Sequence, residues 1–308
     1  SIGQINAAEL AGTVVQEASA SGQKKRKTLV FSVKEWKKMK IGNRDFQTKG
    51  KTYIMGILNV TPDSFSDGGK WNQMDAALRH VDDMLSEGMD ILDIGGESTR
   101  PGYTLITDQQ EIDRVVPIIE AVKARFDVPI SLDTYKSSVA KVGLSAGVDL
   151  INDIWGLKYD PDMVDVIASA DAPCCLMHNR KTDNYNYFFP EMLQDLQETL
   201  DLAYRAGIKQ ESIILDPGVG FAKSYENNLE CVKRLPDLIA AFRLPVLLGT
   251  SRKSMIGLAL NLPKDQRVEG TIATSVIAAM AGCMFVRVHD VQANARAVRM
   301  TEAICNGF

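Results

Sequence analysis

The chain repeats one pattern of hydrophobic and polar positions between residues 53 and 291: a short apolar run ends in polar residues, and a longer amphipathic segment follows it. Buried parallel strands show this pattern when they carry a polar side chain into a loop. The amphipathic segments, such as residues 75–88 and 111–126, are predicted to be helices. Strands are predicted at residues 53–59, 89–94, 129–133, 150–154, 173–178, 213–217, 245–250 and 284–290.

Alternating strands and helices predict right-handed βαβ crossovers and a parallel sheet. Eight such units between residues 53 and 308 fit one closed (β/α)₈ TIM barrel, whose typical size is about 250 residues. A doubly wound open sheet is the alternative. It is disfavoured because no G-x-G-x-x-G motif opens a helix after the first strand, and because polar residues follow all eight strands. In a barrel those strand ends form one ring, so residues that are far apart in sequence converge.

Residues 1–52 lie outside the repeated pattern. Residues 1–27 are predicted to be a flexible tail, because their first part is rich in Ala, Ser, Gly and Gln and their last part is the basic run KKRK. Those four charges favour a solvated linker over a nuclear-localisation signal. Residues 28–52 are predicted to form a short extension that precedes the barrel domain, residues 53–308.

Two local patterns predict the structure of this extension. Ser32 to Glu35 is a capping-box pattern and predicts a short helix over residues 34–40. Residues 43–54 predict a hairpin that turns at Lys49 and Gly50. We expect the hairpin to cover the amino-terminal mouth of the barrel.

The composition favours a cytoplasmic enzyme with small-molecule substrates. The chain has 308 residues with 45% hydrophobic and 24% charged content, enough for a full core, and its net charge of -4 argues against a general nucleic-acid surface. The weakly polar stretch 272–286 contains Thr, Ser and Gly and predicts a buried helix that leads into a strand, with no membrane span. The five cysteines show no C-x-x-C spacing and are predicted to be reduced thiols without a role in zinc or redox chemistry.

Hydrogen-bond acceptors follow three of the predicted strands. Asp133, Asn152 and Asp216 each come directly at the end of an apolar run, so each is expected to point into a confined site. Such a set suits a flat heterocycle that carries amino and ring N–H donors. The alternative is that these side chains cap neighbouring helices or brace loops, as single residues of this kind often do.

Cationic and neutral donors follow other strands and suggest an anionic, phosphorylated ligand. Arg100 follows the second strand and Lys253 the seventh, while Arg287 and His289 lie at alternate positions of the eighth and so share one face. Barrels often bind phosphate around strands seven and eight.

Asn59, at the end of the first strand, offers an oxygen ligand suited to Mg²⁺ with a diphosphate, although no carboxylate cluster dedicated to a metal is evident. Two further residues have structural alternatives. Arg252 is open to pairing with an acid at the start of a helix, and His178 is expected to hydrogen bond within the barrel rim.

Seven segments of the chain match the motifs of one family, in that family's order, between residues 53 and 291. They are GILNVTPDSFSDGG, DIGGESTRPG, SLDT, INDI, DPGVGF, GTSRKSMIG and RVHDV. The chain therefore resembles the dihydropteroate synthases, the folate-pathway enzymes that sulfonamides inhibit. The resemblance implies condensation of 6-hydroxymethyl-7,8-dihydropterin diphosphate with p-aminobenzoate, with Mg²⁺ as cofactor and a homodimer as the assembly.

The resemblance also implies roles for single residues, which fall into four groups. The pterin would be bound by Asp133, Asn152, Asp216 and Lys253, with Asp93 and Met177 behind them. The diphosphate would be bound by Asn59, Arg100, Arg287 and His289, and Asn59 would also bind Mg²⁺. The p-aminobenzoate pocket would consist of Thr99, Pro101, Phe221 and Ser254, with Phe65 on a closing loop, and the catalytic residues would be Arg100, Lys253, Arg287 and His289. A helix is expected to begin near Ser254, so that its N–H groups receive the p-aminobenzoate carboxylate.

Two other functions remain open. A pterin-binding methyltransferase barrel, which passes a methyl group from methyltetrahydrofolate to a corrinoid protein, would share the acidic pocket. It would have no use for the diphosphate cluster, so SRKSMIG and the pair Arg287 and His289 favour the synthase. A non-catalytic pterin-binding barrel would be expected to have lost some of the polar strand ends, and none is lost.

Overall fold

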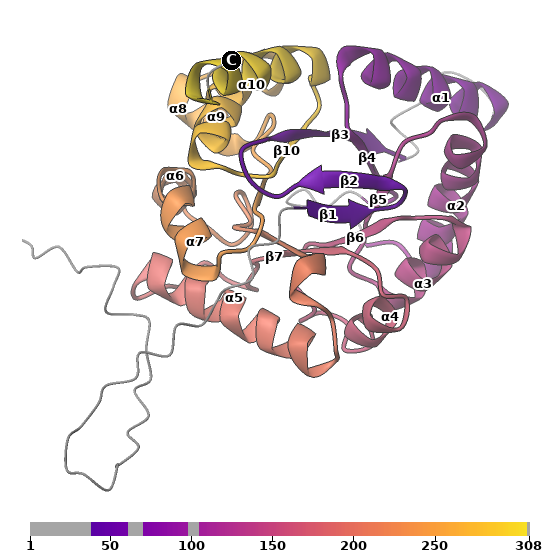
Figure 1. Cartoon of the computed structure of the whole chain (residues 1–308), viewed down its shortest axis with the longest axis horizontal. Helices are drawn as coiled ribbons and strands as arrows, with labels where there is room; N and C mark the ends of the chain where they lie inside the picture. Colours follow the sequence, from indigo (N-terminus) through magenta and orange to yellow (C-terminus); the bar gives the residue numbers. More distant parts are fainter. Residues whose placement is uncertain (1–37, 61–69, 98–104, 307–308) are drawn as a thin grey trace, which may run out of the picture. The chain divides into compact units, whose positions relative to one another are not determined.

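Eight parallel strands form the centre of the molecule, and helices surround them (Figure 1). The computed structural model describes residues 38–60, 70–97 and 105–306. The sheet order is β8-β7-β6-β5-β4-β3-β10-β9, and a parallel bridge between Leu215 and Val246 connects its two edges, so the sheet is a nearly closed barrel. The predicted (β/α)₈ class is confirmed. The strands are β3 (Tyr53–Asn59), β4 (Ile91–Gly95), β5 (Ile130–Asp133), β6 (Leu150–Asp153), β7 (Cys174–Met177), β8 (Ile213–Asp216), β9 (Leu247–Leu248) and β10 (Phe285–Val288).

Amphipathic helices follow the strands, as the sequence pattern predicts. Most strands are buried on both faces, because the helices cover the outside while side chains from neighbouring strands fill the inside. The helices are α1 (Lys70–Glu87), α2 (Asp108–Arg125), α3 (Ser137–Ala146), α4 (Met163–Ser169), α5 (Phe188–Arg205), α6 (Tyr225–Lys233), α7 (Leu235–Phe242), α8 (Ser254–Leu260), α9 (Val268–Ala281) and α10 (Val291–Asn306), with short 3₁₀ helices at Gln210–Ser212 and Lys264–Gln266.

A two-stranded hairpin lies across one mouth of the barrel (Figure 1). Its strands are β1 (Lys38–Ile41) and β2 (Arg44–Gln47), and they pair antiparallel with Ile41 opposite Arg44. Met39, Ile41 and Phe46 are buried, and they form one apolar cluster with residues inside the barrel. Those residues are Tyr53, Met55, Ile91, Leu150, Cys175, Ile214, Leu247, Met284 and Phe285. The hairpin therefore closes the amino-terminal end of the barrel, as predicted.

Two details of the predicted extension were wrong. Of the helix expected over residues 34–40, residues 34–37 lie outside the described residues and the rest belongs to the strand β1 (Lys38–Ile41), because alternate burial of Met39 and Ile41 against the barrel favours the strand period over the local capping pattern. The hairpin turns at Gly42 and Asn43, where Gly42 has φ +60°, and not at Lys49 and Gly50. A two-residue turn with glycine at a positive φ suits the twist of a hairpin.

No helix in the described part of the chain is both long and apolar enough to cross a membrane. The helix predicted ahead of the eighth strand is α9, which ends at Ala281 just before β10. It is buried on one face only, because Thr274 and Ala278 are buried whereas Ile277 and Met280 are exposed, so the prediction of a fully buried helix was wrong. The residue ranges 1–37, 61–69, 98–104 and 307–308, and with them the predicted tail, lie outside the described residues.

Candidate active site at the carboxyl ends of the strands

Strand register brings four polar-site positions into one row. Asn59 lies opposite Gly95, Gly95 opposite Asp133, and Asp133 opposite Asn152. Matched positions on neighbouring strands point to the same face of a sheet, so Asn59, Asp133 and Asn152 share one face. Gly95 leaves room in this row, because a Cβ atom there would lie 3.6 Å from Asp133 Cβ and 3.9 Å from Asn59 Oδ1. The convergence predicted from the sequence is confirmed for these residues.

Arg287 on β10 connects two carboxylates on β4 and β5. Its Nε donates to Asp93 Oδ2 at 2.6 Å, and its Nη2 donates to Asp133 Oδ2 at 2.8 Å. Asp93 is completely buried, and its other oxygen accepts a 2.6 Å hydrogen bond from Ser131 Oγ. The guanidinium fork therefore fixes the carboxylate of Asp133 from one side, which leaves the other side for a ligand.

Two buried acceptors point into this site without a hydrogen-bond partner among the described residues. They are Asp133 Oδ1 and Asn152 Oδ1. Buried polar atoms are nearly always hydrogen bonded, so a pair of unpaired acceptors at the strand ends indicates a place for ligand donors. Asp216 is 6% exposed, and its Oδ1 accepts a 2.7 Å hydrogen bond from Gly218 N.

Burial shifts the pKa values of the ionisable groups at this ring. It raises the pKa of Asp133 to about 7, against the lowering effect of Arg287, and it raises the pKa of Asp216 against that of Lys253. Burial also lowers the pKa of Lys253 to about 8, although Asp216 opposes the shift. For Arg287, burial acts to lower the pKa, but Asp93 and Asp133 outweigh it and raise the pKa above the ordinary value.

Lys253 lies between the acidic ring and an apolar wall. Its Nζ donates to the carbonyl of Val219 at 2.5 Å and lies 4.9 Å from the centre of the Phe221 ring. Phe221 and Trp155 pack against a buried cluster of Tyr135, Ile154 and Met177. The predicted pterin residues Met177 and Lys253 and the predicted p-aminobenzoate residue Phe221 therefore meet at one wall of the site.

The remaining predicted residues have different surroundings. His289 is half-buried, and its Nδ1 lies 2.9 Å from Ser251 Oγ. Ser254 is exposed and is the first residue of α8, so the helix start predicted near it is confirmed. Phe65, Thr99, Arg100 and Pro101 lie outside the described residues.

The structural alternatives for Arg252 and His178 are both confirmed. Arg252 pairs with Asp290, with Nε 3.0 Å from Oδ2, and Asp290 directly precedes α10. His178 is 2% exposed and contacts Asp195 and Lys223 in the rim of the barrel.

The sequence analysis missed two polar groups beside the site. One contains Lys136, whose Nζ lies 3.1 Å from Glu97 Oε1 and 2.8 Å from Glu111 Oε2. The other contains Lys223 and Asp195. Lys223 comes two residues after Phe221, just beyond the DPGVGF motif, and His178 connects it to Asp195 on α5, a contact that no local sequence pattern marks.

The barrel fold and the unpaired hydrogen-bond acceptors at its strand ends are typical of an enzyme that binds a flat polar ligand. The family described as pterin binding enzyme matches residues 55–289. The dihydropteroate synthase of Clostridium beijerinckii is 57% identical over 267 residues, which cover 86% of this chain and 99% of the relative. The chain therefore belongs to the pterin binding enzymes and, within them, to the dihydropteroate synthase family, the transferases of folate biosynthesis.

Two solved structures agree with this assignment. A dihydropteroate synthase from Clostridium difficile, solved in the presence of pteroic acid, is 49% identical with a TM-score of 0.81, and the match covers 83% of this chain and 98% of that one. A dihydropteroate synthase from Xanthomonas albilineans, solved with 4-aminobenzoic acid, is 38% identical with a TM-score of 0.82, and the match covers 87% and 98% of the two chains.

Proposed function

We propose that this chain condenses 6-hydroxymethyl-7,8-dihydropterin diphosphate with p-aminobenzoate, giving 7,8-dihydropteroate and diphosphate. The observation that carries the proposal is the pair of buried, unpaired acceptors Asp133 Oδ1 and Asn152 Oδ1 beside Asp216. A pterin edge presents amino and ring N–H donors, which are the groups these oxygens lack. Pteroic acid, found with the Clostridium difficile relative, joins a pterin to p-aminobenzoic acid, so it combines the two organic parts of the reaction.

The pterin would lie between the acceptors and the apolar wall. Asp133, Asn152 and Asp216 accept from its donors, and Met177 packs against its flat face. Lys253 contributes a donor at the same site. Asp93 acts indirectly: it accepts a hydrogen bond from Arg287, and Arg287 donates to the Asp133 carboxylate and so fixes its position.

The diphosphate would lie at the cationic side of the ring. Arg287, His289 and Lys253 supply positive charge or N–H donors there, and Arg100 is expected to join them. Asn59 Oδ1 offers a neutral oxygen ligand near Asp133, which fits a Mg²⁺ ion that takes its other ligands from diphosphate oxygens and water. Among the described residues, no group of three or more His, Cys, Asp and Glu could hold a metal ion. When bound, Mg²⁺ would stabilise the negative charge of the leaving diphosphate.

The p-aminobenzoate would bind beyond Lys253. Phe221 gives an aromatic wall, and Ser254 opens α8, whose first N–H groups favour a carboxylate. Phe65, Thr99 and Pro101 are proposed to complete this pocket.

The chemistry then needs little more than charge stabilisation and positioning. Diphosphate leaves a methylene carbon whose developing positive charge the electron-rich pterin ring stabilises, while Arg287 and His289 stabilise the departing anion. The aryl amine attacks that carbon as its bond to the diphosphate oxygen breaks, and the resulting acidic anilinium loses its proton to water or to the departing diphosphate, so no dedicated base is needed. Holding both substrates in line converts the reaction into an effectively intramolecular one.

A coupled assay of diphosphate release tests the proposal. Release should require both the pterin diphosphate and p-aminobenzoate, and the product should be 7,8-dihydropteroate. Methyl transfer from methyltetrahydrofolate to a corrinoid protein, without release of diphosphate, would favour the methyltransferase barrel. Pterin binding without turnover would favour a non-catalytic barrel.

We further propose that the protein works in the cytoplasm as a homodimer that buries an apolar face of α8, α9 and α10. Helix α9 contacts both α8 and α10 (Figure 1). Their large exposed apolar side chains include Leu258, Ile277, Met280, Met300 and Ile304, of which Ile304 is 71% exposed. Exposed apolar side chains that gather on neighbouring helices commonly mark an interface.

The dimer has a direct test. The Met280→Glu/Met300→Glu variant should elute as a monomer when its mass is measured by light scattering, because two carboxylates in an apolar interface cost several kcal/mol. Tyr159→Glu, at an exposed large hydrophobic side chain outside these helices, is the control and should leave the mass unchanged. A monomeric wild-type protein would contradict the proposal.

The pKa values of the ring predict a bell-shaped pH dependence for kcat/KM of the pterin substrate. Asp133 accepts pterin donors best as a carboxylate, so the rate should rise as the pH passes its pKa of about 7. It should fall as Lys253 loses its proton near pH 8. Lys253→Arg keeps the charge and should move the alkaline limb upward. A flat profile between about pH 6 and 9 would be inconsistent with these assignments.

A further inference from the structure

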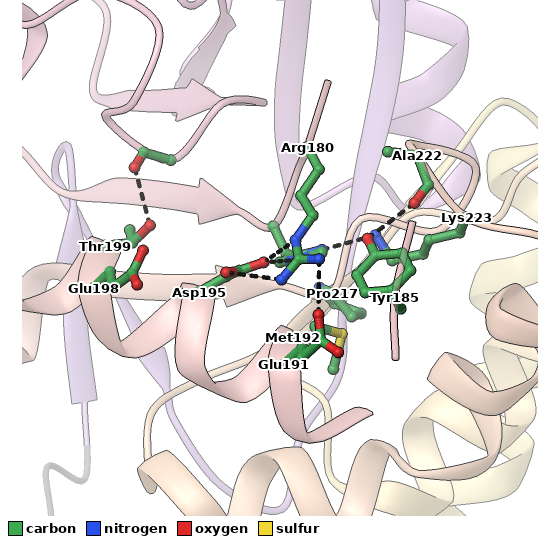
Figure 2. Close-up of polar contacts among 12 residues, drawn as sticks. Arg180, Tyr185, Glu191, Met192, Asp195, Glu198, Thr199, Pro217, Ala222 and Lys223 are labelled. Atoms are coloured by element: carbon green, nitrogen blue, oxygen red, sulfur yellow. Dashed lines mark hydrogen bonds and ion pairs between the residues drawn. The ribbon is translucent and has the colours of Figure 1, made fainter. Parts of the chain in front are cut away.

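A polar network lies between α5, the end of β7 and the loop that follows β8. It consists of Arg180, Tyr185 and Asp195 from the region of α5, His178 at the end of β7, and Lys223 in the loop (Figure 2). We call it the α5–loop network. None of its members was assigned a role in the proposed reaction, and its last residue is two positions from Phe221.

The network is a chain of short hydrogen bonds. Arg180 Nε donates to Asp195 Oδ2 at 2.6 Å, and Arg180 Nη1 donates to Glu191 Oε2 at 3.0 Å. His178 Nε2 lies 2.9 Å from the same Asp195 oxygen, and His178 Nδ1 lies 2.9 Å from Lys223 Nζ. Arg180 also lies over the Tyr185 ring, 4.4 Å from its centre.

Only one arrangement of protons satisfies this chain. Burial lowers the pKa of His178 to about 4, so the imidazole is neutral at physiological pH. The Lys223 ammonium has donors only, so Nδ1 of His178 must accept and Nε2 must carry the proton that goes to Asp195. Asp195 is ionised, since hydrogen bonds from His178 and Arg180 overcome the effect of burial and lower its pKa. Every member is therefore paired, and the network is rigid.

The network ends on two peptide groups of the loop 217–224. Lys223 Nζ donates to the carbonyl of Phe221 at 3.0 Å. Tyr185 Oη donates to the carbonyl of Ala222 at 2.9 Å (Figure 2). Ala222 has φ +43°, a conformation that residues with a Cβ atom rarely adopt and that neighbours must enforce. The two donors thus hold the strained part of the loop, which carries the Phe221 side chain.

The first half of the same loop is held separately. Gly220 N donates to Asn228 Oδ1 at 2.6 Å, and Val219 accepts from Lys253. Loss of Lys223 or Tyr185 should therefore release Phe221 and Ala222 while the contact between Val219 and Lys253 remains. The first half of the loop therefore contacts Lys253, which is assigned to the pterin, and the second half carries Phe221, which is assigned to p-aminobenzoate.

We propose that Lys223 and Tyr185 are positioning residues for the second substrate: through the Phe221 and Ala222 carbonyls they set the aromatic wall that receives p-aminobenzoate. The inference rests on the proposed function, because it assigns Phe221 to that pocket. Arg180, Asp195 and His178 orient Lys223, and the β7–α5 region thereby becomes a determinant of affinity for the aryl amine.

Steady-state kinetics with both substrates varied test the inference. Lys223→Met removes the donor and keeps the length of the side chain, and we expect about a ten-fold higher KM for p-aminobenzoate with kcat within about three-fold of wild type. Tyr185→Phe removes one hydroxyl group and should raise the same KM about three-fold. The Kd of 6-hydroxymethylpterin, measured by calorimetry, should stay within about two-fold in both variants.

Controls separate positioning from general stability. Lys223→Arg keeps a donor and should restore most of the affinity for p-aminobenzoate, whereas Lys209→Met, which removes an exposed lysine paired with Asp171, should change nothing. If the wild type turns over and the KM for p-aminobenzoate is unchanged in both Lys223→Met and Tyr185→Phe, the inference is wrong, while the proposed function stands. An equal weakening of pterin and p-aminobenzoate would also overturn it. Absence of p-aminobenzoate-dependent diphosphate release in the wild type would contradict the proposed function itself.

Discussion

The Asp216→Asn and Asp133→Asn variants should each bind 6-hydroxymethylpterin about 100-fold more weakly than the wild type, or not measurably. The substitution replaces one acceptor oxygen by an amide that donates, so it both removes a partner and sets donor against donor. A buried donor left without a partner costs about 1–3 kcal/mol, and more when a charge is involved. Two such effects together correspond to about a 100-fold change, since 1.4 kcal/mol is a factor of ten.

Neither substitution should unfold the protein. Burial raises the pKa of both carboxyl groups, so the ionised forms are held at a cost that a neutral amide avoids. Thermal unfolding should therefore give a melting temperature close to that of the wild type, whereas calorimetry should show that the affinity for the pterin is lost. Asp171→Asn, at an exposed carboxylate paired with Lys209, is the control for the substitution. Full affinity in both site variants would show that the pterin binds elsewhere.

Arg287→Met should destroy activity and also destabilise the fold. Arg287 pairs with Asp93 and Asp133, and its removal takes the ion-pair partner away from two carboxylates in a low-dielectric interior. Breaking a buried ion pair in this way typically costs about 3–5 kcal/mol. If Arg287 stabilises the leaving diphosphate, as proposed, the loss of its charge should lower kcat by about 100-fold or more. Urea unfolding and diphosphate release measure the two effects separately.

The stability deficit of Arg287→Met should depend on pH. The pKa of Asp133 is already raised by burial, and losing Arg287 raises it further. Because this folded-state pKa lies above the unfolded value, the penalty for burying the carboxylate is fully present above the folded pKa. It disappears as the pH falls and the group takes up a proton. The deficit should therefore be smaller at about pH 5 than at pH 8.

A triple variant provides the internal control for this argument. Adding Asp93→Asn and Asp133→Asn to Arg287→Met removes the stranded charges and should recover part of the stability but none of the activity. Arg205→Met, at an exposed arginine on α5, should be nearly silent. A stable and active Arg287→Met protein would mean that the buried pairs contribute neither to folding nor to catalysis.

The sequence by itself determined the strands and helices, because each follows from a hydrophobic pattern within a short segment of the chain. Apolar runs of strand length and the amphipathic segments between them are local patterns, so the eight strands and the barrel could be predicted from periodicity. The start of α8 near Ser254 was expected from the family resemblance instead. The polar residue that follows each run also marks its strand end, which is why Asp133, Asn152 and Asp216 were found. Arg252 was open to pairing with an acid, and the acid is Asp290 at the start of α10.

Only the tertiary structure decided the contacts between distant segments. Residues 38–40 fit a helix locally, yet burial of Met39 and Ile41 against the barrel makes them a strand. Arg287 could have faced a phosphate alone, but it lies against two carboxylates that are 194 and 154 residues away in the chain. Lys223 and Asp195 meet only through His178. Such partners have no fixed spacing in sequence, because barrel closure brings their strand ends together, and burial then forces each charge to find a partner.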